Sequence, residues 1–274
     1  MIALPSYPYS LSEIKERIEE INKQPLSSFS SEKEAVKFAL NCIDLTTLEG
    51  SDNAKKIEML CTNALQYKTA AVCVYPVFVK QAKQLLQYTD IKVASVAGAF
   101  PAGQSPIEIK VKEVEYAVAQ GADEIDMVIS RGLFLEGNYE TVYNEIVTIK
   151  KACQHAHLKV ILETGELIEP ELIFKASMLA MYAGADFIKT STGKITINAT
   201  PEAFLVMLDA IFQFNKETNK QIGIKPAGGI TDLNTTLLYL KLLEKTLNIN
   251  WLSNNYFRIG ASRLALQLYN FIEN

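Results

Sequence analysis

A regular alternation of short β-branched runs with longer amphipathic stretches occupies the sequence from about residue 40 onward. Short apolar runs bounded by turn residues are typical of buried strands, and apolar residues that recur every three or four positions are typical of helices. Strands that alternate with helices indicate βα units and a parallel sheet. Eight such units predict an α/β protein with the (β/α)8 TIM-barrel fold. The predicted strands are residues 42–45, 71–75, 92–97, 124–129, 159–163, 186–190, 222–225 and 257–260, and the predicted helices are about residues 52–67, 77–88, 105–120, 138–154, 170–183, 201–217, 232–247 and 262–272.

The length of 274 residues allows one domain or two. No linker rich in Gly, Ser or Pro interrupts the alternation, so we expect residues 41–274 to form one barrel domain. Residues 1–40 are expected to form an N-terminal helical extension, in which Ser10 and Glu13 have the spacing of a capping box. This extra helix should pack against the barrel or against a neighbouring subunit, so a homodimer is one expected assembly. Its apolar stripe consists of Leu11, Ile14, Ile18 and Ile21.

The charge balance of the chain is acidic. Lys and Arg number 27 and Asp and Glu number 31, which gives a net charge of −4. This balance argues against a nucleic-acid-binding protein of the broadly basic kind. The longest apolar run, residues 70–79, contains a proline and is shorter than the ~20 residues that span a bilayer, so no membrane partner is expected. The first ten residues, MIALPSYPYS, have no charged segment before an apolar core, which favours a cytoplasmic location.

The cysteines and histidines do not have the spacing of a metal site. Cys42, Cys61, Cys73 and Cys153 form no close pair, so we expect reduced thiols and no structural zinc. His155 and His157 lie in a polar stretch before a predicted strand and are interpreted as surface residues.

Two lysines stand at the carboxyl ends of predicted strands. Lys189 lies in FIKTSTGK (187–194) and Lys225 lies in IGIKPAGG (222–229). A lysine in a barrel strand is unusual, because lysine is almost never fully buried without a partner. Both side chains should face the mouth of the barrel at which active sites of this fold are built.

A buried ammonium group close to a second positive charge favours its neutral form, and a neutral amine is a nucleophile toward carbonyl groups. One of the two lysines can therefore form a Schiff base while the other keeps it deprotonated. The segments GADEID (121–126) and GADFIK (184–189) follow the same plan, which places Asp126 at the height of Lys189, where a carboxylate can move protons. The alternative is a purely structural ion pair between Asp126 and one lysine, which is poor stability design.

Glycines follow the last two predicted strands. PAGG (226–229) and GAS (260–262) lie where this fold frequently binds phosphate with backbone N–H groups and a helix N-terminus. Lys194, in the loop after the sixth predicted strand, can add a positive charge.

At these residues the chain closely resembles the deoxyribose-phosphate aldolase family of class I aldolases. The resemblance extends over about residues 43–262 in the family's order, and the FIKTSTGK and KPAGG blocks are highly specific. The matching segments are IDLTTL (43–48), CVYP (73–76), GADEIDMV (121–128), LKVILETGEL (158–167), AGADFIKTSTGK (183–194), NATPE (198–202), GIKPAGGI (223–230) and RIGAS (258–262).

The resemblance implies a cofactor-independent lyase of deoxyribose phosphate catabolism that cleaves 2-deoxy-D-ribose 5-phosphate to D-glyceraldehyde 3-phosphate and acetaldehyde. It implies that Lys189 forms the imine and that Asp126 and Lys225 donate and accept protons. The implied partners are a sugar phosphate and aldehydes. Asp44 and Thr192 would line the sugar site, and the implied phosphate ligands are Lys194, Gly228, Gly229, Gly260 and Ser262.

Other residues of the matching segments receive smaller roles. Lys159 and Glu163 are expected to orient the proton relay, and Cys73 is interpreted as a packing residue. The chain departs from the family at Thr231, where many members have arginine, and at Arg263, where relatives often have a second serine. It also ends in FIEN, without the terminal tyrosine that helps proton transfer in some members.

Two other functions fit the sequence less well. The first is a related Schiff-base aldolase with a different aldehyde phosphate as acceptor. The second is a barrel that only binds a metabolite or regulates another protein, which the presence of all three proton-handling residues disfavours.

Overall fold

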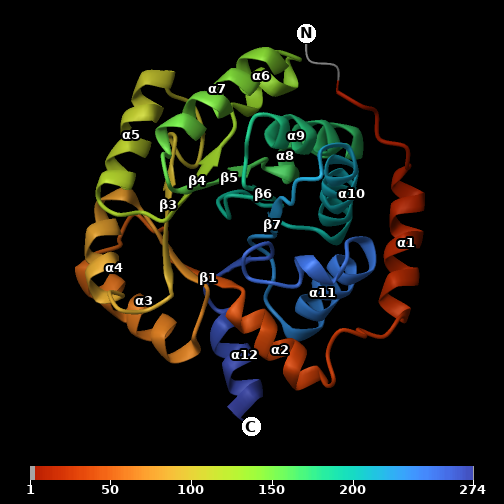
Figure 1. Cartoon of the computed structure of the whole chain (residues 1–274), viewed down its shortest axis with the longest axis horizontal. Coiled ribbons are helices and arrows are strands. Elements are labelled where there is room, and N and C mark those ends of the chain that lie inside the picture. The colour runs from red at the N-terminus through yellow and green to blue at the C-terminus, as the bar shows by residue number, and fades with distance from the viewer. Residues whose placement is uncertain (1–3, 274) are drawn as a thin grey trace.

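The computed structural model describes residues 4–273, in which strands and helices alternate as a barrel requires. Figure 1 shows the strands in the centre and the helices around them. The strands are β1 Ile43–Thr46, β2 Ala71–Val74, β3 Lys92–Ala97, β4 Glu124–Val128, β5 His157–Ile161, β6 Phe187–Lys189, β7 Gly223–Lys225 and β8 Ile259–Ala261. The helices are α1 Leu11–Lys23, α2 Glu32–Asn41, α3 Ala54–Tyr67, α4 Val79–Leu85, α5 Ile107–Ala119, α6 Arg131–Leu135, α7 Tyr139–Ala152, α8 Thr164–Leu167, α9 Pro170–Tyr182, α10 Pro201–Thr218, α11 Leu233–Thr246 and α12 Leu264–Glu273, with short 3-10 turns at Pro76–Phe78 and Ile249–Trp251.

The eight strands form one parallel sheet in the order β7-β6-β5-β4-β3-β2-β1-β8. Backbone hydrogen bonds close the gap between the two outer strands. Ile224 N–H donates to Tyr256 O at 2.8 Å, Arg258 N–H donates to Ile224 O at 3.0 Å, and Gly260 N–H donates to Pro226 O at 2.9 Å. The predicted (β/α)8 barrel is therefore confirmed, and all eight predicted strands are present with small differences at their ends.

The loops at one end of the barrel carry more structure than the sequence pattern predicts. The predicted helix 77–88 is a 3-10 turn followed by the shorter helix α4. The short helices α6 and α8 follow β4 and β5 directly and were not predicted. Both add ordered backbone next to the carboxyl ends of these strands, where the candidate site lies.

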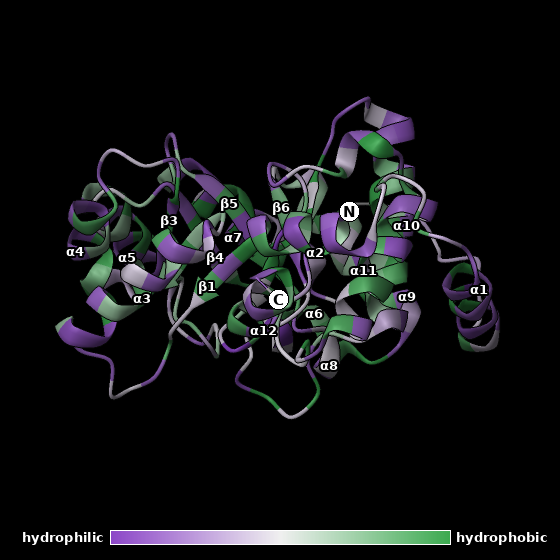
Figure 2. Ribbon diagram, turned by 90° about the horizontal axis from the view of Figure 1, so that it is seen from below, coloured by the Kyte–Doolittle hydropathy of each residue, from purple (hydrophilic) through white to green (hydrophobic). Residues whose placement is uncertain are grey.

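The N-terminal extension contains two helices, whereas the sequence predicted one. Helix α1 begins as predicted at a capping box, in which Ser10 N–H donates to Glu13 Oε2 at 2.8 Å. Figure 2 shows α1 at one side of the molecule, largely hydrophilic, and it packs against α10 and α11. Of the predicted apolar stripe only Ile14 is fully buried, and Leu11 is exposed. The second helix, α2, packs against α11 and α12, while residues 1–3 of the predicted extension lie outside the described residues.

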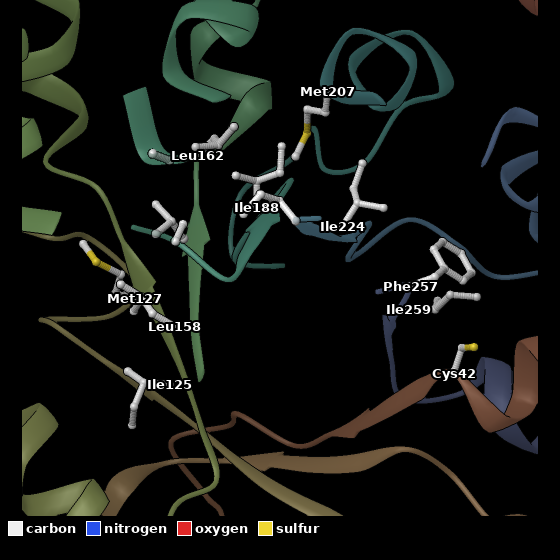
Figure 3. Close-up of a cluster of buried hydrophobic side chains, with 14 of the residues drawn as sticks. Cys42, Ile125, Met127, Leu158, Leu162, Ile188, Met207, Ile224, Phe257 and Ile259 are labelled. Atoms are coloured by element: carbon white, nitrogen blue, oxygen red, sulfur yellow. The ribbon is translucent and has the colours of Figure 1, made fainter. Parts of the chain in front are cut away.

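The core has two parts, because successive side chains of a strand point to opposite faces. The larger part lies between the strands and the helices. Figure 3 shows this outer layer at Ile188 of β6 and Ile224 of β7, which lie near Met207 of α10. Inside the barrel the apolar cluster is small and consists of Leu48, Cys73, Ala94 and Val96. Inward positions of β1, β4, β5, β6 and β7 hold the charged side chains of the candidate site.

No helix within residues 4–273 is long and apolar enough to cross a membrane.

Candidate active site

Three predicted residues meet inside the barrel, at the centre of a network of hydrogen bonds. Lys189 Nζ, at the end of β6, donates to Asp126 Oδ2 at 2.8 Å. Lys225 Nζ, at the end of β7, donates to the same oxygen at 2.7 Å. The two lysines are direct partners in the pairing of β6 with β7. Because β4, β6 and β7 are parallel, their inward side chains converge at one end of the barrel, as the sequence predicted.

The second oxygen of Asp126 accepts a hydrogen bond from another lysine. Lys159 Nζ of β5 lies 3.0 Å from Asp126 Oδ1, and Asp126 and Lys159 are partners in the strand pairing. Lys159 also pairs with Glu124, two residues before Asp126 on the same face of β4. The predicted contact between Lys159 and the proton relay is therefore present. The predicted contact of Glu163 is different, because its carboxylate binds Thr192.

Asp44 lies below the lysines in this network. Its Oδ2 is 2.5 Å from Lys225 Nζ, and its Oδ1 accepts a hydrogen bond from Arg258 Nη1 at 2.7 Å. Arg258 also donates through Nη2 to Glu124 Oε1 at 2.8 Å. Asp44 is fully buried, so in this structure its carboxylate contacts basic side chains and does not reach the cleft described below.

The electrostatics of the network differ between the two strand-end lysines. Burial lowers the pKa of Lys189 and the positive charge of Lys225 lowers it further, against the opposing effect of Asp126. Burial also acts to lower the pKa of Lys225, but the carboxylates of Asp126 and Asp44 outweigh it and raise that pKa. Burial favours the neutral form of Asp126, yet the three surrounding lysines hold its pKa well below the usual value.

Counting charges identifies Lys189 as the base in excess. Within the described residues, the network joins three carboxylates to four basic side chains. The carboxylates are Asp44, Glu124 and Asp126, and the basic side chains are Lys159, Lys189, Lys225 and Arg258. The other three bases have raised pKa values because of their carboxylate neighbours, against the effect of burial. Lys189 is therefore the amine that can be neutral while the others balance the carboxylates.

A cleft of about 400 Å³ opens above this network. Lys189 lines it, whereas Asp126 and Lys225 lie deeper. The structure brings to this cleft all six of the remaining predicted ligands, and it adds Thr231 and Arg263. The predicted ligands that line it are Thr192, Lys194, Gly228, Gly229, Gly260 and Ser262.

The walls of the cleft combine backbone and cationic groups. Helix α12 begins at Leu264, so its free N–H groups and positive dipole end lie beside Ser262. Lys194 Nζ forms an exposed ion pair with Glu49 Oε1 at 2.9 Å. Gly260 is required by close packing, because a Cβ there would lie 2.7 Å from Ala227 Cβ and 3.1 Å from Lys225 Cε. These walls can accept an anionic group next to a buried amine.

Cys73 is buried in the inner apolar cluster, and burial raises its pKa to about 11, as suits a packing residue. All four cysteines are free and buried, and both histidines are exposed. Within residues 4–273 no group of three or more His, Cys, Asp or Glu side chains is arranged to hold a metal ion.

Sequence reasoning missed Arg258 and Glu124. Both lie in matching segments: Glu124 stands two residues before Asp126 on β4, and Arg258, directly before β8, stands two residues before Gly260. That spacing is the signal that could have found them, because residues i and i+2 of a strand share a face.

Comparisons with known proteins identify the family of this chain. Residues 38–243 match the DeoC/LacD family aldolase. The deoxyribose-phosphate aldolase of Bos taurus is 47% identical over 248 residues, which are 84% of this chain and 78% of the bovine protein. That of Homo sapiens is 47% identical over 244 residues, which are 82% of this chain and 77% of the human protein. The solved structure of deoxyribose phosphate aldolase from Aeropyrum pernix superposes with a TM-score of 0.73 at 25% identity, covering 96% of this chain and 98% of that one. The chain therefore belongs to the DeoC/LacD family of aldolases and is an aldolase.

Proposed function

We propose that this aldolase reversibly cleaves 2-deoxy-D-ribose 5-phosphate to D-glyceraldehyde 3-phosphate and acetaldehyde through a Schiff base on Lys189. The observation that carries the proposal is the pair of hydrogen bonds from Lys189 and Lys225 to one oxygen of Asp126, at 2.8 and 2.7 Å, below a cleft that is lined by glycines, Ser262 and Arg263. The names of the mammalian relatives supply the substrate.

The first step is the attack of the neutral Lys189 amine on the C1 carbonyl of the open-chain sugar. Its lowered pKa favours the neutral form, and Lys189, unlike the deeper Lys225, lines the cleft. The resulting carbinolamine loses its hydroxyl group as water. Lys225, whose raised pKa keeps it protonated, supplies the proton for that water.

The second step breaks the C2–C3 bond. Asp126, a carboxylate at neutral pH, takes the proton of the C3 hydroxyl, and the C2–C3 electron pair moves into the iminium to give an enamine and D-glyceraldehyde 3-phosphate. Asp126 then returns that proton to C2, which gives the acetaldehyde iminium. Water hydrolyses this iminium, releases acetaldehyde and restores the amine of Lys189 and the proton of Lys225.

The substrate phosphate binds at the other end of the cleft. Gly229 and Ser262 offer backbone or hydroxyl donors beside the N-terminus of α12, while the N–H groups of Gly228 and Gly260 donate to Gly260 O and Pro226 O. Thr231 and Arg263 line the same cleft, so the arginine at 263 can supply the positive charge that many family members carry at 231.

A cleavage assay tests this function. Acetaldehyde release should be fastest from 2-deoxyribose 5-phosphate, and the Lys189→Ala variant should release none above background. Faster cleavage of another sugar phosphate would favour a Schiff-base aldolase with a different acceptor. No cleavage of any sugar phosphate by the folded protein would favour a metabolite-binding barrel and overturn the proposal.

The assembly and location of the protein stay predictions. We propose a cytoplasmic enzyme with reduced thiols that works without a cofactor and forms a homodimer. Sedimentation at micromolar concentration tests the dimer, since a monomer or a tetramer of this 30.5 kDa chain differs clearly in mass.

A further inference from the structure

Residues 163–165 lie just after β5, beyond Leu162, and they hold the loop that follows β6. Glu163 is fully buried, and its backbone has the left-handed conformation, with φ of 59°. Both carboxylate oxygens of Glu163 accept hydrogen bonds from Thr192. Thr192 N–H donates to Oε1 at 3.0 Å, and the Thr192 hydroxyl donates to Oε2 at 2.5 Å. A residue with a side chain adopts this backbone conformation at a cost of about 1 kcal/mol or more, so the surroundings hold Glu163 there.

The next two residues contact the same loop at two further points. Thr164 N–H donates to Thr190 O at 2.9 Å. Gly165 lies so close to the loop that a Cβ there would be 2.0 Å from Ile197 O, which no side chain can meet. Residues 163–165 therefore fix the loop at Thr190, Thr192 and Ile197, on both sides of the cleft residue Thr192.

Arg131, the first residue of α6, supports Glu163 from the opposite side. Its Nη1 lies 3.7 Å from Glu163 Oε2 and donates to Pro101 O at 3.0 Å. Its Nε lies 2.5 Å from Glu166 Oε2. The guanidinium group thus joins the loops after β3, β4 and β5 and gives the buried Glu163 carboxylate a positive partner.

These contacts determine what Thr192 can offer to a substrate. A carboxylate only accepts hydrogen bonds, so the single hydroxyl proton of Thr192 is directed to Glu163. The Thr192 oxygen also accepts from Lys194 N at 3.1 Å, and it retains one further acceptor position. Thr192 lines the cleft, so it faces a ligand there as a hydrogen-bond acceptor without a proton to give.

We infer that Glu163, supported by Arg131, is a positioning residue that makes Thr192 a selective acceptor for a hydroxyl group of the aldehyde substrate. A hydroxyl donates to such an oxygen, whereas an aldehyde that lacks the hydroxyl gains nothing from it. This inference rests on the proposed function and adds a determinant of specificity to it.

The test compares two acceptor aldehydes in the synthesis direction, with acetaldehyde as the donor. The acceptors are D-glyceraldehyde 3-phosphate and its analogue without the C2 hydroxyl. In the Glu163→Gln variant the amide cannot accept both hydrogen bonds of Thr192, and its NH2 group can donate to Thr192 Oγ1. We expect kcat/KM to fall about tenfold for D-glyceraldehyde 3-phosphate and less than about twofold for the analogue. Equal losses for both acceptors, or no loss for either, would overturn the inference.

Two further variants keep the test decisive. Glu166→Gln removes another carboxylate next to Arg131 that has no contact with Thr192, so the preference for the hydroxylated acceptor should stay as in the wild type. Thr192→Val removes the acceptor oxygen itself and should lower the preference as Glu163→Gln does, and the double variant should lose no more than either single variant. If Glu163→Gln does not fold, an unchanged preference in Thr192→Val contradicts the inference on its own.

The same proteins separate this inference from the proposed function. Trapping of an acetaldehyde imine needs no acceptor hydroxyl, so it should succeed in the wild type and in Glu163→Gln. Absence of the imine in the wild type would refute the proposed function, while a trapped imine with an unchanged hydroxyl preference would refute only the role of Glu163.

Discussion

Lys189 and Lys225 donate hydrogen bonds to the same oxygen of Asp126, at 2.8 and 2.7 Å, from adjacent positions on β6 and β7. The negative charge of one carboxylate cannot fully neutralise the positive charges of two ammonium groups. The second carboxylate, Asp44, contacts Lys225, at 2.5 Å, so Lys225 keeps its charge. The pKa of Lys189 is lowered by burial and by this charge, so the pKa values of two chemically identical side chains are shifted in opposite directions.

Replacing Lys225 by leucine removes the positive charge next to Lys189. The pKa of Lys189 should rise, because burial alone then acts against the stabilising effect of Asp126. The alkaline shift should appear in the pH dependence of imine formation, and kcat should also fall by about 10²–10⁴ because a proton donor is lost. Lys216→Leu, a surface substitution, is the control and should leave the pH profile in place. An unshifted profile in Lys225→Leu would mean that burial alone activates Lys189.

Replacing Asp126 by asparagine should separate imine formation from bond cleavage. The carboxylate is the proposed base for the C3 hydroxyl proton, so cleavage of 2-deoxyribose 5-phosphate should fall by about 10²–10⁴. The change also removes the charge that raises the pKa of Lys189, which favours the neutral amine. Mass spectrometry after reduction should therefore still find the acetaldehyde adduct on Lys189. Loss of both reactions in a folded variant would contradict the separate roles.

Replacing Asp44 by asparagine should destabilise the protein at neutral pH. Asp44 pairs with Lys225 and Arg258, and breaking a buried pair costs about 3–5 kcal/mol. Burial acts to raise the pKa of Asp44, but its basic neighbours hold it well below the usual value. Its stabilising effect is therefore present above the unfolded pKa of about 3.9 and is lost as the pH falls below that value.

Urea unfolding from pH 7 to pH 3 measures this dependence. The difference in the free energy of unfolding between the wild type and Asp44→Asn should be large at pH 7 and should shrink below about pH 4. Asp90→Asn, at an exposed position, is the control and should follow the wild type throughout. A difference that does not change with pH would show that Asp44 stabilises the fold by shape and not by charge.

Replacing Arg263 by alanine should weaken the binding of the phosphate group. Arg263 lines the cleft beside Ser262, and a charge-assisted hydrogen bond to phosphate is worth about 1.5–3 kcal/mol. The KM for 2-deoxyribose 5-phosphate should rise about tenfold or more, and the KM for unphosphorylated 2-deoxyribose should not change. Adding Thr231→Arg to this variant should restore the lower KM. A failure of Thr231→Arg to restore it would argue against an exchange of cations between the two positions.

The barrel and its reactive centre were predictable because each rests on a local pattern. Alternating strands and helices indicated the fold, and Lys189 and Lys225 were visible as charged residues in otherwise apolar strands. In a parallel barrel all strands end at the same mouth, so strand-end residues meet without any knowledge of loop conformation. Which lysine acts as the nucleophile was left open by the residues alone, and it depends on contacts between distant strands.

The supporting residues were harder to predict because their partners are far apart in the sequence. Arg258 contacts Asp44 across 214 residues and Glu124 across 134 residues, and the spacing of two residues within a strand indicates a shared face but not the distant partner. Asp44 was expected to line the sugar site, and the structure places it below the cleft because its two oxygens face Arg258 and Lys225. The sequence was interpreted as one helix ahead of the barrel, so the second N-terminal helix, α2, was not predicted.

Reduction with borohydride in the presence of acetaldehyde tests the central claim most directly, because it examines the nucleophile, the substrate and the reaction type together. We expect one two-carbon adduct on Lys189, located by peptide mass spectrometry, and no adduct on Lys225 or Lys159. An adduct on another lysine, or none on the active protein, would contradict the claim that Lys189 is the Schiff-base nucleophile.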